Sequence, residues 1–183
     1  EAFERTREAG MIAAGALDEV AKIIKPGITT NDIDKLCYEF INDNGAYSAP
    51  LFYRGFPKSC CTSANHVICH GIPQNKILNE GDIVNVDVTA FKKSWHGDTS
   101  RMFYVGEVSI KAKKLTDVTY NSMMKAIKIL NKEITLGRPK HNPNIFLGKI
   151  EYKPDIISLT ELQALYLRDK DSFLIDGNIR KKV

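Results

Sequence analysis

Two aspartates, Asp87 and Asp98, lie in neighbouring segments in which polar and apolar residues alternate. From Ile83 to Thr89 every second residue is Val, a pattern typical of a strand with one buried face, and Asp87 lies on the other face. The next predicted strand, from Trp95 to Val105, carries on alternate positions His96, Asp98 and Ser100. Because aspartate is depleted in strands, two on one face indicate a site rather than a surface.

The hairpin between these strands sets the distance between the two aspartates. We expect Lys92-Lys93 to form its tip, which would place Asp87 directly opposite Asp98, although a bulge would shift this register. Facing Cβ atoms are ~4.5 to 5.5 Å apart, and like charges at that distance repel unless a cation lies between them. Carboxylate oxygens suit Mn, Fe, Co or Zn, and a close pair suits two such ions in metal-assisted hydrolysis. The alternative is two solvent-facing aspartates paired with Lys or Arg.

Histidines and cysteines between residues 60 and 70 form a second candidate group. His66 and His70 have the spacing of zinc ligands on a helix, but Val67-Ile68 and the following Gly-Ile-Pro favour a strand and a turn. His70 then acts either as a structural residue or as a general acid and hydrogen-bond donor. The cysteines are small buried hydrophobes, or they contribute to a structural zinc site made of Cys60, Cys61, Cys69 and His70.

Aromatic residues and a thiol lie near Gly55 and Pro57, a local pattern that favours core packing over an apolar pocket. Tyr53, Phe56 and Cys61 lie on this segment, where they either line such a pocket or pack in the core.

Helices are predicted on both sides of the strand-rich region. Apolar residues recur at helical spacing from Ala2 to Ile24, before the Pro26-Gly27 stop. A second helix begins after Thr29-Thr30, either of which can cap it, and runs to Asn44-Gly45. Antiparallel strands and loops follow from Tyr47 to Gly106. Helical spacing then returns from Ile110 to Ile134, and the Gly137 to Pro139 break that follows suggests a second copy of the first unit.

Length and charge restrict the class of protein. A chain of 183 residues fits one domain with a tail, and we expect that it begins inside a longer chain because its first residue is Glu. The net charge of +4 is spread along the sequence, which argues against specific nucleic-acid binding but allows a ribosome contact. No apolar run is long enough to span a bilayer and no signal peptide is evident, so we expect a cytoplasmic protein with reduced cysteines.

Four segments together closely resemble the type I methionine aminopeptidases. They are Phe56-Pro57-Lys58-Ser59, Cys69-His70-Gly71-Ile72-Pro73, Gly81-Asp82-Ile83-Val84-Asn85-Val86-Asp87-Val88-Thr89 and His96-Gly97-Asp98-Thr99-Ser100-Arg101-Met102-Phe103. The similarity covers roughly residues 1 to 139, in the family's order and with nearly its spacing.

This resemblance implies an α+β fold, the N-terminal half of a "pita-bread" fold with an antiparallel sheet and flanking helices. It implies two divalent metal ions, with Asp87 as a bidentate ligand of one and Asp98 bridging both. His70 would be the catalytic histidine and would hydrogen-bond the substrate. Tyr53, Phe56 and Cys61 would form the methionine pocket. The implied reaction is attack of a metal-bound hydroxide on the first peptide bond of nascent polypeptides, which removes their N-terminal methionine.

The sequence departs from the family after Arg138. The family's later ligand motifs, Gly-His-Gly-Ile-Gly and Phe-Thr-Ile-Glu-Pro, do not occur, so residues 1–139 are assigned to the N-terminal half and 140–183 to a divergent tail. A truncated or frameshifted gene, a fragment, or a partner chain that supplies the second half each fits this pattern. The alternative functions are an inactive truncated fragment, a non-catalytic binding module, and a prolidase-like or aminopeptidase P-like hydrolase.

Overall fold

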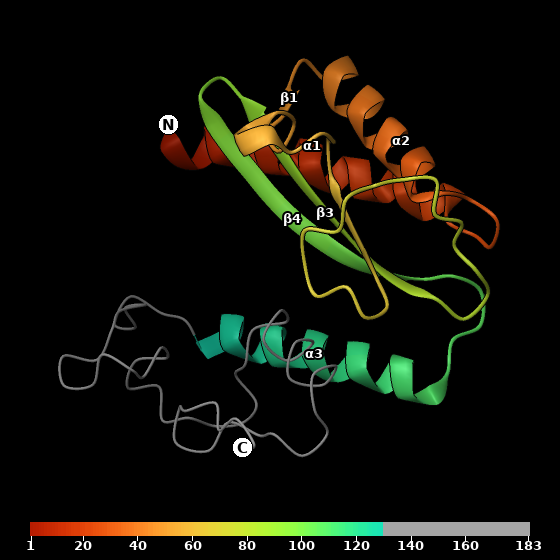
Figure 1. Cartoon of the computed structure of the whole chain (residues 1–183). Helices are drawn as coiled ribbons and strands as arrows, with labels where there is room; N and C mark the ends of the chain where they lie inside the picture. Colours follow the sequence, from red (N-terminus) through yellow and green to blue (C-terminus); the bar gives the residue numbers. More distant parts are fainter. Residues whose placement is uncertain (130–183) are drawn as a thin grey trace, which may run out of the picture. The chain divides into compact units, whose positions relative to one another are not determined.

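The computed structural model describes residues 1–129 (Figure 1). The chain divides into two units, Glu1–Ala112 and Lys113–Val183, which are described separately. The helix α3, Ile110–Ile129, confirms the helix expected from Ile110 as far as the described residues extend. The predicted repeat near Gly137 and the tail 140–183 lie outside them. Within residues 1–129, none of the helices combines the length and the apolar character that crossing a bilayer requires.

Two helices begin the first unit, as the sequence predicts. The first, α1, spans Ala2–Ile23, and the second, α2, spans Thr30–Asp43. The α2 start is a capping box, in which the Thr29 side chain accepts from the Asp32 amide and the Asp32 carboxylate accepts from the Thr29 amide (2.7 Å). This reciprocal pair satisfies backbone donors that the first helical turn leaves without partners.

A four-stranded antiparallel sheet follows, with β3, Ile83–Lys92, at its centre. Along its whole length β3 pairs with β4, Trp95–Tyr104, while its other edge pairs with β2, Cys61–Ala64, and then with β1, Tyr47–Ser48. A short 3-10 turn, Tyr53–Gly55, lies between β1 and β2. The antiparallel strands expected between residues 47 and 106 are therefore confirmed.

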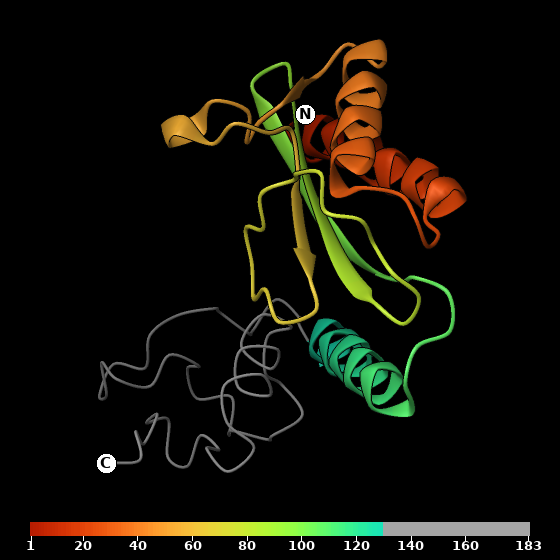
Figure 2. The ribbon, with the colours of Figure 1, turned by 45° about the vertical axis from the view of Figure 1, so that its right-hand side comes forward.

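The two helices cover one face of the sheet (Figure 2). Both contribute to a single buried core together with the inward residues of β3, which are Val84, Val86, Val88 and Ala90. The buried stripe of α1 is rich in small residues that allow a close approach to the sheet, and it comprises Ala9, Ile12, Ala13, Ala16, Leu17 and Val20. Alternation along β3 and β4 leaves the opposite face of the sheet for polar side chains.

The expected register of the hairpin is wrong by two residues. Its tip is Lys93-Ser94, both with positive φ (50° and 69°), as a type I′ turn requires. Lys92 pairs with Trp95, so Asp98 lies opposite Thr89, and Asp87 lies opposite Ser100. A shift of two residues preserves the face of every side chain because the strand period is two. Asp87 and Asp98 therefore still share a face, as diagonal neighbours.

Helix α1 closely approaches the sheet at Gly97, between His96 and Asp98 on β4. A methyl group on Gly97 would overlap the backbone of Ala9 and Gly10 in α1. Only glycine lets the helix backbone lie this close to the strand. The contact fixes the part of β4 that carries Asp98.

We predict that Gly97→Ala will destabilise the protein by about 3 kcal/mol, because overpacking a closed contact costs ~1 to 3 kcal/mol. Gly10→Ala is the matched control: a methyl group there meets no atom within 4 Å. It should stabilise the helix by up to ~1 kcal/mol. Urea unfolding of both variants measures the difference, and equal stability of the two would contradict the contact.

Candidate metal centre and pocket

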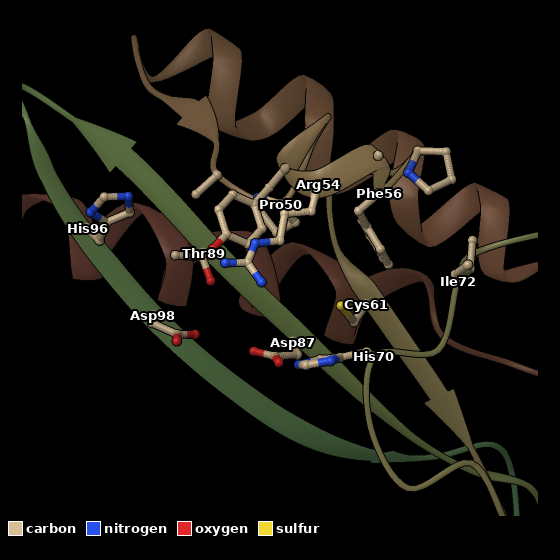
Figure 3. A pocket seen from close by; sticks show the side chains of 14 residues that line it. Pro50, Arg54, Phe56, Cys61, His70, Ile72, Asp87, Thr89, His96 and Asp98 are labelled. Carbon is tan, nitrogen blue, oxygen red and sulfur yellow. The ribbon is translucent and has the colours of Figure 1, made fainter.

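A pocket of about 900 Å³ opens on the face of the sheet opposite the helices (Figure 3). It brings together every site residue that the sequence predicts: Tyr53, Phe56, Cys61, His70, Asp87 and Asp98. Their positions range from residue 53 to residue 98, and they come from β2, β3, β4 and the loops that flank β2. The fold thus gathers groups that are far apart in the sequence into one cavity.

Asp87 and Asp98 form the acidic floor of the pocket (Figure 3). Burial, repulsion by Asp98 and a hydrogen bond with Asp98 together raise the pKa of Asp87 to about 6, while the charge of His70 opposes the shift. The two carboxylates are therefore close enough to disfavour a second negative charge. At neutral pH such a pair is a site where a cation is stabilising.

Cys61 is the neighbour of Asp87 on the other side, since the two pair across β2 and β3. Burial, followed by the negative charges of the nearby acidic groups and Cys69, raises the pKa of the Cys61 thiol to about 11. The thiol is consequently neutral at physiological pH. It forms an apolar part of the wall next to the acidic floor.

His70 reaches the pocket from a loop after β2, on a left-handed residue with φ of 53°. The next residue fixes the loop against β2: the Thr62 amide donates to the Gly71 carbonyl (2.7 Å), and the Gly71 amide donates to the Ser63 hydroxyl (3.2 Å). A methyl group on Gly71 would overlap the Thr62 carbonyl. Glycine at position 71 therefore holds His70 in place.

The zinc alternatives are not supported by this arrangement. His66 and His70 lie in turns and loops rather than on a helix. Cys60 is fully buried in the core and does not line the pocket, although Cys61 does. Within residues 1–129, no group of three or more His, Cys, Asp or Glu side chains is arranged to hold a metal ion.

The outer wall of the pocket is the segment 49–57, which projects from the sheet (Figure 2). Three of its residues have positive φ: Phe52 (65°), Arg54 (49°) and Gly55 (83°). The pocket also contains residues whose role the sequence does not indicate. Among these are Arg54, Ile72 and His96.

His96 could have been expected from alternation, because it shares a face of β4 with Asp98. Its ring lies 4.8 Å from that of Phe91 between ring centroids. Arg54 lies in the short 3-10 turn and Ile72 in a loop, and no periodic pattern in these segments indicates which way a side chain points.

An antiparallel sheet with helices on one face and paired carboxylates on the other is the arrangement expected for one half of a pita-bread fold. The chain belongs to metallopeptidase family M24, which its residues 4–154 match.

The relatives give this assignment more detail. Methionine aminopeptidase of Rickettsia prowazekii is 53% identical over 135 residues, which are 74% of this chain and 52% of that protein. Methionine aminopeptidase 2 of Mycobacterium tuberculosis is 51% identical over 127 residues, 69% of this chain and 45% of the relative. The chain spans about half the length of the curated relatives it matches.

Solved structures agree with the sequence comparison. The R. prowazekii methionine aminopeptidase superposes with a TM-score of 0.67 at 56% identity, over 68% of this chain and 50% of that one. The Thermotoga maritima enzyme superposes with a TM-score of 0.69 at 37% identity, over 71% and 53%. The expected pita-bread fold class is thus confirmed, over about half of the length of these structures.

The family implies divalent metal ions, and the pocket floor fits part of such a site. Two carboxylates whose repulsion raises the pKa of Asp87 are suitable oxygen donors for a divalent cation. They provide only two ligand side chains, so the remaining coordination positions fall to other donors.

We predict that Asp98→Asn will raise the melting temperature of the metal-free protein at pH 7. A carboxyl whose folded pKa is about 6, above its ordinary value of 3.8, loses native-state stability as pH rises between these values. Removing the repelling charge recovers part of that loss. Solvent screening limits the gain to about 1 kcal/mol, or ~2 to 4 °C.

Asp43→Asn is the control, because Asp43 is an exposed aspartate at the end of α2. It should leave the melting temperature unchanged. At pH 4, where Asp87 is protonated in the native protein, the gain from Asp98→Asn should disappear. A gain of equal size at pH 4 and pH 7 would contradict carboxylate repulsion.

Proposed function

We propose that this chain carries the metal-binding carboxylates and the methionine pocket of a methionine aminopeptidase, a hydrolase that removes the N-terminal methionine from nascent polypeptides. The observation that carries the proposal is the convergence of Asp87, Asp98, His70 and an apolar wall on one pocket. The similarity to methionine aminopeptidases at 44 to 53% identity supports the substrate class.

In this proposal Asp87 and Asp98 hold the divalent ions, and Mn, Fe, Co or Zn suits their oxygens. The two aspartates stand on adjacent strands as diagonal neighbours, so both carboxylates could contribute oxygen ligands to a shared cation site. The chemistry that the ions supply, when bound, is Lewis acidity toward the scissile carbonyl oxygen and toward water.

His70 has the catalytic role, as a hydrogen-bond donor to the substrate near the scissile peptide. Its loop places it beside Asp87, whose pKa its charge lowers. The exposed imidazole can therefore reach a peptide that lies over the carboxylates.

Tyr53, Phe56 and Cys61 form the pocket for the methionine side chain. Aromatic rings and a neutral thiol offer an uncharged surface to a flexible thioether, which makes favourable sulfur–aromatic contacts. Specificity for methionine would follow from this composition.

The location and partners belong to the same proposal. Nascent polypeptide N-termini are the substrate, a cytoplasmic location follows from that substrate, and a ribosome contact is consistent with the net charge of +4. The mild, dispersed charge gives no reason to propose specific nucleic-acid binding.

A non-catalytic pita-bread module that binds peptides is the second candidate. The specific observation in its favour is that the pocket contains two carboxylates, and that residues 1–129 contain no group of three or more side chains placed to hold a metal ion. Affinity for a metal falls when ligands are few. Xaa-Pro dipeptidase and aminopeptidase P structures share the fold at 20 to 22% identity, which supports no prolidase-like activity here.

We predict that the purified chain, with Mn²⁺ or Co²⁺, will release methionine from a Met-Ala-Ser peptide, and that Asp98→Ala will abolish release. Removing one of two carboxylate ligands should cost at least ~10-fold in metal affinity, because few donors remain. Free methionine measured by chromatography gives the rate.

Asp43→Ala is the matched control and should retain the native rate. No release by the native chain, together with no Mn²⁺ binding by calorimetry, would reject the catalytic proposal for this chain. Peptide binding without release would favour the non-catalytic module instead.

A further inference from the structure

Asp34 on α2 binds a segment that leads into the pocket through several hydrogen bonds and an ion pair. Its carboxylate oxygen Oδ1 accepts from the Ser59 amide (2.7 Å), the Ser59 hydroxyl (2.6 Å) and the Cys60 amide (3.3 Å). The other oxygen lies 3.5 Å from the Lys58 ammonium. The Asp34 side chain is only 13% exposed, so these bonds are shielded from water.

The residues that Asp34 binds lie between two pocket residues. Phe56 precedes them in the outer wall, and Cys61 follows them at the start of β2 (Figure 3). Asp34 itself does not line the pocket. Its carboxylate therefore determines where two wall residues stand without touching what the pocket binds.

The outer wall depends on few other bonds to the body of the protein. At its beginning the Ala49 amide donates to the Thr89 carbonyl on β3 (2.9 Å). The hydrogen bonds within the wall connect wall residues to one another, such as that from the Phe52 amide to the Phe56 carbonyl (2.8 Å). Left-handed residues at Phe52 and Arg54 cost conformational energy, which requires fixed ends. Asp34 supplies the fixed end on the β2 side.

A carboxylate is suited to this task because it is acceptor-only and meets several donors at once. Charge-assisted bonds to backbone amides are shorter and stronger than neutral ones. Lys58 balances the negative charge and is itself held by the Asn31 side chain (2.7 Å). A side chain without an acceptor oxygen at position 34 would leave the buried backbone amides of Ser59 and Cys60 without this partner.

We propose that Asp34 is a positioning residue for the methionine pocket, holding Ser59 and Cys60 so that Phe56 and Cys61 form its wall. This inference rests on the proposed function, because it takes the pocket to bind methionine. The metal-binding carboxylates stand on β3 and β4, whose pairing does not involve Asp34. Loss of Asp34 should therefore weaken methionine binding more than metal binding.

The test compares Asp34→Ala with Asp43→Ala, a change of the same type at an exposed position of the same helix. Calorimetry with Mn²⁺ alone, and with L-methionine in the presence of Mn²⁺, gives two dissociation constants at a temperature where each variant is folded. We expect Asp34→Ala to weaken methionine binding about tenfold, equivalent to ~1.4 kcal/mol, and to change Mn²⁺ binding less than twofold. Asp43→Ala should change neither.

Asp34→Asn keeps one acceptor oxygen for the two backbone amides and should restore most of the methionine affinity. If Asp34→Ala does not fold, Asp34→Asn tests the inference in its place. Asp34→Asn must then bind methionine more weakly than the native chain does. With Met-Ala-Ser as substrate, the loss should appear in KM rather than in kcat.

The possible results distinguish failure of this inference from failure of the proposed function. Methionine binding by Asp34→Ala equal to that of the native chain would overturn the inference alone. Equal weakening of Mn²⁺ and methionine binding would also overturn it, because the role would then be general stability. No binding of methionine by the native chain would overturn the proposed function and the inference together.

Discussion

The packing of α1 against the inward face of β3 and β4 is the interaction on which the rest of the described structure depends. Burial of Val84, Val86 and Val88 under the small residues of α1 decides which face of the hairpin turns inward. Strand alternation then sends every intervening side chain to the other face. The carboxylates are thus placed by apolar residues that take no part in binding.

The pocket lowers the stability of the protein locally, and the hydrophobic core must offset this loss. Burial and mutual repulsion raise the pKa of Asp87, so the ionised pair is unfavourable unless a cation is near. Left-handed backbone at Phe52, Arg54 and His70 adds conformational cost around the same pocket. Strain concentrated in a cavity, on a regular sheet, is typical of sites built for binding rather than for rigidity.

The sequence predicts the helices, the strands and the shared face of the two aspartates because each follows from a local period. It does not predict the register of the β3–β4 hairpin, because a two-residue shift keeps every side chain on its face. Only the turn residues distinguish one register from the other. The left-handed pair Lys93-Ser94 has no strong signal such as Asn-Gly. Tyr53, Phe56, Cys61 and His70 were expected at the pocket from a family resemblance, whereas Arg54 and Asp34 emerge only from three-dimensional contacts.

The close approach of Gly71 to the Thr62 carbonyl has a consequence for how genetic data on this protein would look. A screen that scores variants by activity should find positions 70 and 71 equally intolerant of substitution, although residue 70 has an imidazole side chain and residue 71 has no side chain. Side-chain chemistry accounts for the first result and excluded volume for the second. Intolerance to substitution next to the proposed catalytic residue is therefore no measure of chemical involvement. A swap to a residue of similar size distinguishes chemistry from volume at position 70, while position 71 permits no such swap.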